Sequence, residues 1–365
     1  MDILNAELVW VDGRCYRQLP VRKSLNTEQE ETFQPVRPQK LIDDDYEDSS
    51  LPIKHEGDTF YIPITVPIES IGYILGKKGQ TKNQIENDTS TKIIIPRRKE
   101  VKNFDEAQKK MKNFDKAEKE MKNFDEDDIT ITGCNRSCVA KAYTKIYNIV
   151  QDMRWKKMKF THFISIPIND QSIQDKFLSF QKDVLRNCRG VNENLFESPY
   201  KLHLTIAMLT LMTKQEREAA AAMLQKSKDS ILELLNGKSL RVEIKGVEYM
   251  NDEPEAVTVL YGKVRETDSD NCLQIIANKL SKTFAESRFG VKALSDDPDN
   301  VKLHVTLMKA KTGERGYRET FDATQILKKY ADYTFGQTTV KEIHVSIRFT
   351  YGKDGYYKPF HVLKL

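Results

Sequence analysis

The chain lacks a long apolar run. No stretch of its 365 residues approaches the roughly 18–20 apolar residues that a membrane-spanning helix needs. The first residues, Met1 to Leu4, also lack the basic region of a secretory signal. We therefore expect neither a membrane partner nor secretion.

Cysteine is scarce and scattered. The five cysteines are an odd number without regular spacing, which is typical of reduced thiols in a cytosolic or nuclear protein: Cys15, Cys134, Cys138, Cys188 and Cys272. Cys134 and Cys138 have no second Cys or His pair at zinc spacing. No metal site and no cofactor are expected.

A large excess of charge of one sign is also absent. The formal net charge is +4, so the chain as a whole does not indicate a nucleic-acid partner, and local charge must carry that inference. With 39% hydrophobic and 31% charged residues, the composition is that of a globular protein. The length predicts two or three domains.

Histidine is rare too, but two of the six histidines stand in matching frames. Lys201-Leu202-His203-Leu204-Thr205-Ile206 and Lys302-Leu303-His304-Val305-Thr306-Leu307 each place a His-x-Thr inside an apolar run. Side chains alternate along a β-strand, so the His and Thr of each motif share one face of their strand. The repeat predicts an internal duplication that folds into one site.

A site with two histidines and two hydroxyls suits a phosphate ester. Two imidazoles on opposite sides of it can act as base and acid, because histidine titrates near neutral pH. Two threonine hydroxyls can hydrogen-bond the non-bridging oxygens, and no metal is required. The expected catalytic residues are His203, Thr205, His304 and Thr306, and the sequence does not assign base and acid between the two histidines.

The duplicated motif resembles that of the two-histidine (2H) phosphoesterase superfamily, over residues 160 to about 350. Supporting segments are Phe163-Ile164-Ser165-Ile166-Pro167-Ile168, Gly246-Val247-Glu248-Tyr249-Met250-Asn251-Asp252 and Phe321-Asp322-Ala323. The resemblance implies a duplicated, two-lobed α+β domain that hydrolyses an RNA phosphodiester or a 2′,3′-cyclic phosphate.

Upstream, residues 59–153 alternate strand and helix patterns in the order β-α-α-β-β-α, with Gly76-Lys77-Lys78-Gly79 between the first two helices. A Gly-x-x-Gly alone is a weak signal, but its glycines allow close backbone approach and the following helix start favours phosphate. Ser70 to Gly79, followed by Ile85 and Lys92 to Ile95, resembles a type I KH domain. The resemblance implies that this loop binds single-stranded nucleic acid; a KH fold kept as a protein-interaction scaffold is the alternative.

The expected fold class is α+β, in three parts. Residues 1–58 are a partly disordered acidic segment, interpreted either as a partner-docking tail or as a solvated leader. Residues 59–153 are the KH domain, and residues 154–365 are the 2H phosphoesterase-like domain. A ten-residue repeat that begins at Lys102, Lys112 and Lys122 forms an insert at about 99–127. It is interpreted as a tolerated charged loop with helical tendency or as a partner-binding arm.

For residues 154–365 the patterns predict seven strands and four helices. The strands are Phe160–Ile168, Lys201–Leu209, Leu240–Tyr249, Val257–Val264, Val301–Lys309, Val340–Phe349 and Tyr357–Leu363. The helices are Ser172–Cys188, Lys214–Leu235, Asn271–Ser287 and Ala323–Tyr333.

Weaker signals keep two interpretations each. His344 and Ser346 look like a third motif copy, either structural or lining the cleft, and Lys309 is a candidate to face the phosphate. Tyr249 is interpreted as a core residue or a base-stacking one. The basic segment Arg154 to Lys159 either extends an RNA path or is a solvated helix end.

A KH unit followed by a 2H unit resembles a family of subunits of a helicase-containing transcription-coactivator complex linked to alkylation-damage repair. That resemblance implies nuclear residence, single-stranded RNA as a partner, and membership of such a complex. Two alternatives to a phosphodiesterase stay open. In one, a non-catalytic module recognises RNA or a nucleotide and tethers RNA to the complex. In the other, both domains are protein-interaction surfaces.

Overall fold

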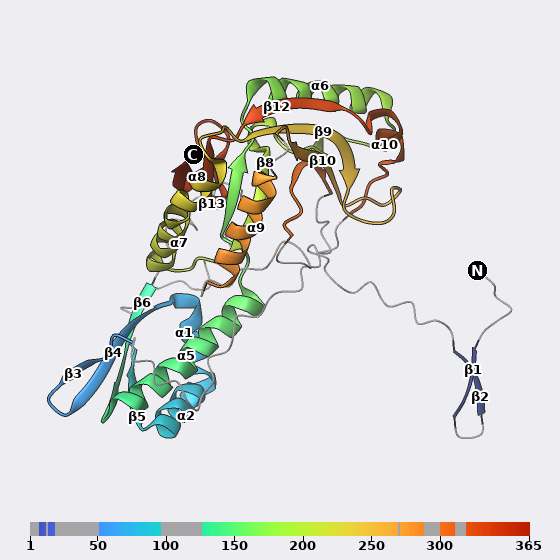
Figure 1. Cartoon of the computed structure of the whole chain (residues 1–365). Helices are drawn as coiled ribbons and strands as arrows, with labels where there is room; N and C mark the ends of the chain where they lie inside the picture. The colour runs from blue at the N-terminus through green and yellow to red at the C-terminus, as the bar shows by residue number, and fades with distance from the viewer. Residues whose placement is uncertain are drawn as a thin grey trace.

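The computed structural model describes residues 51–95, 126–268, 271–287, 300–310 and 319–365 (Figure 1). It also gives the backbone of an antiparallel hairpin, β1 (Glu7–Val11) and β2 (Arg14–Gln18). The predicted strand at Leu8 to Val11 is confirmed. The acidic run of the N-terminal segment and nearly all of the repeat insert lie outside the described residues. Within the described residues, no helix is both long and apolar enough to cross a membrane.

The first unit follows the predicted β-α-α-β-β-α order. Its elements are β3 (Lys54–Glu56), β4 (Thr59–Pro67), α1 (Ile68–Leu75), the 3-10 turn η1 (Lys77–Gly79), α2 (Gln80–Thr89), β5 (Thr91–Ile94), β6 (Glu126–Gly133) and α5 (Arg136–Lys157). The strands form an antiparallel sheet in the order β3-β4-β6-β5. Strand β3 was not predicted, because its three residues are all exposed and carry no apolar alternation.

Helices α1, α2 and α5 cover one face of this sheet, and their apolar stripes form its core. Ile62, Ile93 and Ile131 face inward from the three main strands, and Ile74 and Ile85 meet them from the helices. Asn135 caps α5, since its side chain accepts a hydrogen bond from the amide of Cys138. Residues 153 and 154, the predicted domain boundary, both lie inside α5.

The second unit is built on an eight-stranded antiparallel sheet in the order β12-β9-β10-β11-β8-β7-β13-β14. Its strands are β7 (His162–Pro167), β8 (His203–Leu209), β9 (Arg241–Tyr249), β10 (Val259–Glu266), β11 (His304–Lys309), β12 (Thr334–Thr339), β13 (Glu342–Tyr351) and β14 (Tyr357–Lys364). Its helices are α6 (Gln171–Asn187), α7 (Lys214–Lys226), α8 (Lys228–Leu235), α9 (Cys272–Ala285) and α10 (Thr324–Tyr330). Short 3-10 turns lie at Glu193–Leu195 and Pro199–Lys201.

All seven predicted strands are present, and three of the four helices are confirmed as single elements. The predicted helix Lys214–Leu235 is wrong as one element, because it breaks at Ser227 into α7 and α8. Ser227 directs its hydroxyl back to the carbonyl of Met223, a bond that favours a bend. Strand β12 was missed, because it is a polar edge strand with Gly336 at φ 135.

The sheet consists of two four-stranded halves that meet at β8 and β11. These two strands share a single registered pair, Leu204 with Val305, whereas β7 and β8 share six. The halves are β12-β9-β10-β11 and β8-β7-β13-β14, and each carries one His-x-Thr motif at its inner edge. The predicted duplication into two antiparallel lobes is confirmed.

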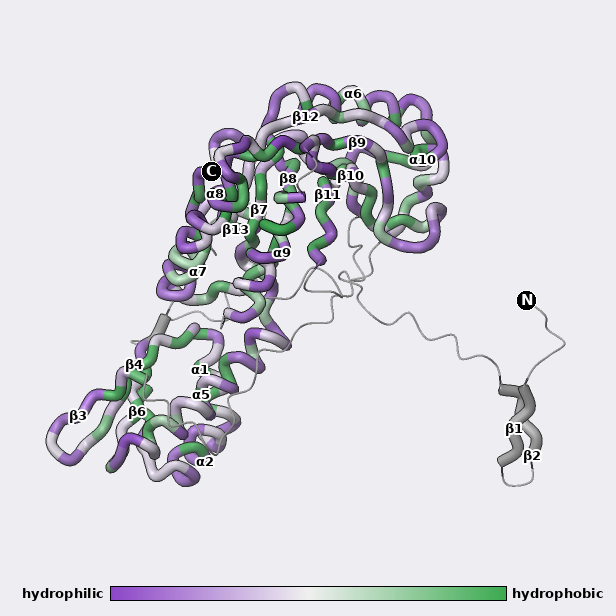
Figure 2. Tube along the Cα trace, in the orientation of Figure 1, coloured by the Kyte–Doolittle hydropathy of each residue, from purple (hydrophilic) through white to green (hydrophobic). Residues whose placement is uncertain are grey.

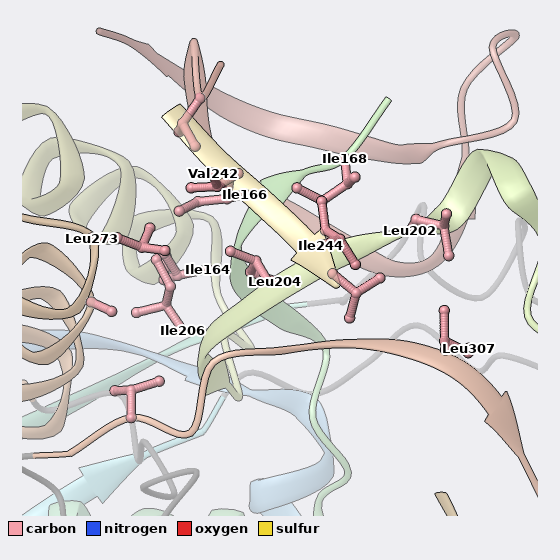
Figure 3. Close-up of a cluster of buried hydrophobic side chains, with 14 of the residues drawn as sticks. Ile164, Ile166, Ile168, Leu202, Leu204, Ile206, Val242, Ile244, Leu273 and Leu307 are labelled. Carbon is pink, nitrogen blue, oxygen red and sulfur yellow. The ribbon is translucent and has the colours of Figure 1, made fainter. Parts of the chain in front are cut away.

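One large core lies on a single face of this sheet. Helix α9 packs on β8, α7 on β13 and β14, α6 on β12 and α10 on β9. Figure 3 shows Ile164 and Ile166 of β7 beside Ile206 of β8 and Leu273 of α9. Figure 2 shows many hydrophobic residues on the central strands β7 and β8 and many hydrophilic ones along α6. The opposite face of the sheet lies outside this core.

The two units are joined through α5. Arg154, 3% exposed, forms an ion pair with Glu216 of α7, and Glu216 also closes the capping box on Thr213. Met212, just before α7, is fully buried in the core of the first unit. Of the basic segment, Arg154 is thus part of the junction, whereas Lys156 and Lys157 are exposed at the end of α5.

Buried histidine makes the fold sensitive to acid. Burial, with the charge of Arg217, lowers the pKa of His162 from 6.5 to about 3. Below pH 6.5 the unfolded chain takes up a proton that the folded chain refuses, so stability is lost as pH falls toward 3. At pH 5 we expect this loss to be about 2 kcal/mol.

The measurement is the free energy of unfolding by urea at pH 7 and pH 5, for the wild type and His162→Gln. Since glutamine does not titrate, the variant should lose less stability over this interval. Equal losses in the two proteins would contradict the prediction.

Candidate functional site

The two His-x-Thr motifs lie on adjacent strands and on the same face. Continuing the register of Leu204 with Val305 places His203 opposite Thr306 and Thr205 opposite His304. Leu204 and Val305 point the other way, into the core. The four predicted catalytic residues are each half-buried, and the strand pairing brings them together in a crossed arrangement.

Both imidazoles are fixed in the same way. Nδ1 of His203 lies 2.6 Å from the carbonyl oxygen of Lys201, and Nδ1 of His304 lies 2.8 Å from that of Lys302. A carbonyl only accepts, so Nδ1 carries the hydrogen in each ring. The lone pair of a neutral ring is then on Nε2, the atom that can exchange protons with a ligand.

The duplication extends beyond the motifs. A β-bulge follows Thr205 where β8 pairs with β7, and another follows Thr306 where β11 pairs with β10. Each bulge inserts one residue, so the residue three positions after each threonine returns to the motif face. In β11 this residue is Lys309, which is exposed and close enough to His203 to lower its pKa.

The surroundings of the two histidines differ. His203 is enclosed by aromatic rings, with ring centres 5.2 Å away for Phe163, 5.4 Å for Tyr357 and 6.5 Å for Tyr356. Burial lowers the pKa of His203 to about 4, and the charges of His304 and Lys309 add to the effect. The ring is therefore neutral at pH 7.

His304 lies in a more polar setting. The ring of Tyr261 meets it edge-on at 5.4 Å, and the Tyr261 hydroxyl donates to Glu248 over 2.8 Å. Burial, and then the neighbouring Glu248, raise the pKa of Tyr261, so the phenol keeps its proton. Lys263 pairs with the same carboxylate at 3.0 Å, and the ammonium of Lys302 lies 5.0 Å from the Tyr261 ring centre.

The aromatic neighbours were missed by sequence reasoning. Phe163 and Tyr261 could have been predicted, because β7 and β10 pair with the motif strands and side-chain alternation places both rings on the motif face. Tyr356 and Tyr357 carry no local signal. They reach His203 only because β14 pairs with β13 and β13 pairs with β7, contacts far apart in the sequence.

The third motif copy, His344 and Ser346, lies on the same face of the sheet, but both of its side chains are buried. His344 lies opposite Ser165, which itself lies opposite Thr205. Yet His344 is only 7% exposed and bonds to Glu342, while Ser346 bonds to Ser165, whose hydroxyl also meets that of Tyr356. This buried network favours the structural interpretation.

Two further expectations concern the core and metal binding. Tyr249 packs against the main core, in agreement with the core interpretation. Within the described ranges, no group of three or more His, Cys, Asp or Glu residues is arranged to hold a metal ion.

In the first unit, Gly76-Lys77-Lys78-Gly79 forms a tight turn between α1 and α2. Gly76, Lys78 and Gly79 all have positive φ, at 68°, 53° and 80°. The amide of Gly79 donates to the carbonyl of Gly76 over 3.2 Å, and no side chain caps the start of α2. Lys77 and Lys78 are exposed beside these amides, an arrangement that suits a phosphate.

Gly76 has no room for a side chain. A Cβ there would lie 2.1 Å from the Thr81 hydroxyl oxygen and 2.9 Å from the Thr81 amide nitrogen. We expect Gly76→Ala to lower the free energy of unfolding by about 1–3 kcal/mol, measured by urea denaturation. Gly72→Ala is the matched control, because a Cβ at this helical position meets nothing within 4 Å. Equal stability of the two variants would contradict the expected clash.

Family models match both units. A model described as "AKAP7 2'5' RNA ligase-like domain" matches residues 160–365, and one described as "KH domain" matches residues 62–148. The chain is 33% identical over 380 aligned positions to activating signal cointegrator 1 complex subunit 1 of Mus musculus, covering 98% of each chain. A-kinase anchor protein 7 isoform gamma of Homo sapiens is 27% identical over 148 positions, 40% of each chain.

A solved structure from Thermus thermophilus, that of the protein TT0787, is also similar. It aligns with 56% of this chain and 97% of its own length, at 18% identity and a TM-score of 0.38. That overlap is too low to bear on the site.

Proposed function

The chain belongs to the activating signal cointegrator 1 complex subunit 1 family, and we propose that it is an RNA-binding phosphoesterase. Its KH domain binds single-stranded RNA, and its 2H domain hydrolyses an RNA phosphodiester or a 2′,3′-cyclic phosphate. The observation that supports this most is the pair of crossed His-x-Thr motifs, both with Nδ1 held by a backbone carbonyl.

In the proposed reaction, His203 is the general base. It is neutral at pH 7, and its Nε2 accepts a proton from the attacking water or hydroxyl. As the new phosphorus–oxygen bond forms, the bond to the leaving oxygen breaks, and protonated His304 donates a proton to that oxygen. The two rings then return to their starting states by exchange with solvent.

Thr205 and Thr306 are proposed to hold the phosphate during this exchange. Neither hydroxyl is hydrogen-bonded within the part of the chain that the structure describes, so both can donate to non-bridging oxygens. Lys309 adds positive charge on the same face. All of these groups belong to the protein, so the proposed reaction requires no metal.

The KH loop is proposed to bind the RNA backbone through Gly76, Lys77, Lys78 and Gly79. The uncapped amides at the start of α2 and the two lysine charges offer a site for phosphates. The 33% identity over nearly the whole chain supports further proposals: nuclear residence and membership of a helicase-containing coactivator complex linked to alkylation repair.

Turnover is tested first. Short RNAs with a 2′,3′-cyclic phosphate or an oligouridine 3′ end are incubated with the protein in EDTA. Each of His203→Ala and His304→Ala should lower kcat by roughly 10²–10⁴-fold, because general acid–base catalysis contributes that much. RNA affinity should change little. RNA binding without turnover in the wild type would instead support a recognition module.

RNA binding is tested at the loop. A Cβ at Gly79 meets nothing within 4 Å, so a side chain fits, although φ is 80°. We expect Gly79→Asp to weaken binding of a single-stranded RNA by about tenfold in low salt, since the carboxylate repels phosphate.

Gly79→Asn is the matched control, because asparagine tolerates positive φ and carries no charge. Affinity is measured by fluorescence anisotropy at two salt concentrations. Equal affinities for the Asp and Asn variants would argue against phosphate at this loop.

A further inference from the structure

A row of aromatic rings leads outward from His203. Its ring lies 5.4 Å from that of Tyr357, which in turn lies 5.3 Å from that of Tyr351. The ammonium of Lys201 lies 3.7 Å from the centre of the Tyr351 ring, a cation–π contact that holds the ring in place. Tyr351 is 41% exposed, so this row ends in an open aromatic surface.

A strained residue turns Tyr351 toward the site. Ser346 is on the motif face, and strict alternation would send a residue five positions later to the opposite face. The pairing of β13 with β14 shifts between Ser346 and Tyr351, and Phe349 in this interval has φ 64°. A bulky residue with positive φ is unfavourable, and such strain clusters at functional positions. The bulge places Tyr351 opposite Tyr357, on the motif face.

The duplication supplies an internal comparison. Lys201 and Lys302 occupy equivalent positions in the two motifs, and each lies over a tyrosine ring. Tyr261, beneath Lys302, is 3% exposed, and its hydroxyl is held by Glu248. Tyr351, beneath Lys201, is open instead. Of this matched pair of tyrosines, only Tyr351, on the His203 side, is exposed, although Lys201 covers one face of its ring.

Two cations near this ring row suit the phosphates of a nucleotide. Lys201 lies on Tyr351, and Arg348, on the same strand as Tyr351, is close enough to Tyr357 to influence its pKa, as is the carboxylate of Glu197. The base of a nucleotide provides a flat π surface for Tyr351, and the phosphates of the nucleotide are attracted by Lys201 and Arg348. An apolar peptide would match the rings but not the charges.

We propose that Tyr351, supported by Tyr357 and Lys201, is the stacking site for the nucleobase next to the reacting phosphate. This site rests on the proposed function, because it assumes that RNA reaches the His-x-Thr face. It also sets the direction of the substrate: the base lies on the His203 side, and the sugar-phosphate chain continues toward His304 and Lys302.

The test uses a dinucleotide of 2-aminopurine and uridine that ends in a 3′-phosphate, whose fluorescence is quenched on stacking. Binding is measured with the full chain carrying Gly79→Asp, so that the KH loop contributes little. Tyr351→Leu in this background should weaken binding by about tenfold and abolish the quench, as expected for one stacked base. Tyr351→Phe should retain both.

Phe360→Leu is the matched control. Phe360 is exposed on the paired strand β14, but its ring contacts His162 rather than His203, so binding should not change. Unchanged affinity and quench in Tyr351→Leu would overturn the stacking site, as would a dinucleotide that binds no better than ribose phosphate.

Turnover of the cyclic-phosphate RNA by the wild type is measured in parallel. If the RNA is turned over but the quench does not depend on Tyr351, the stacking site is wrong and the phosphoesterase proposal is supported. If the quench depends on Tyr351 but the RNA is not turned over, the stacking site is supported and the phosphoesterase proposal is contradicted.

Discussion

The site depends on one backbone pairing, that of Leu204 with Val305. This pair joins the two halves of the sheet and turns both side chains into the core. Because alternation is strict on either side of it, the same pairing forces His203, Thr205, His304 and Thr306 onto the opposite face. A slip of one residue would bury the histidines and expose the leucine and valine. The hydrophobic core therefore sets the arrangement of the polar groups.

Much of the architecture could be predicted from short-range patterns. The His-x-Thr repeat and the Gly-x-x-Gly turn each consist of residues that are neighbours in the sequence, so both can be recognised from the sequence alone. The crossed placement of His203 opposite Thr306 is not, because it depends on which strands pair and in what register. The pairing of Tyr357 with Tyr351 has the same origin: it follows from a bulge at Phe349, and no local signal identifies a phenylalanine with positive φ.

The two lobes show how a duplicated frame acquires different surroundings. The motif, the carbonyl contact at Nδ1 and the bulge after each threonine are shared. What differs is the adjacent strands: β7 and β14 bring aromatic rings to His203, whereas β9 and β10 bring Glu248 and Lys263 near His304. Equivalent histidines thus receive unequal electrostatic environments.

The hydrogen bonds at Nδ1 have an evolutionary consequence. In each ring the acceptor is a main-chain carbonyl, of Lys201 or of Lys302, and not a side chain. No amino-acid replacement at those two positions removes that oxygen. A substitution at Lys201 or Lys302 can therefore change the local charge while the proton stays on Nδ1 of the histidine. Only a change in the path of the strand would remove the hydrogen bond at Nδ1.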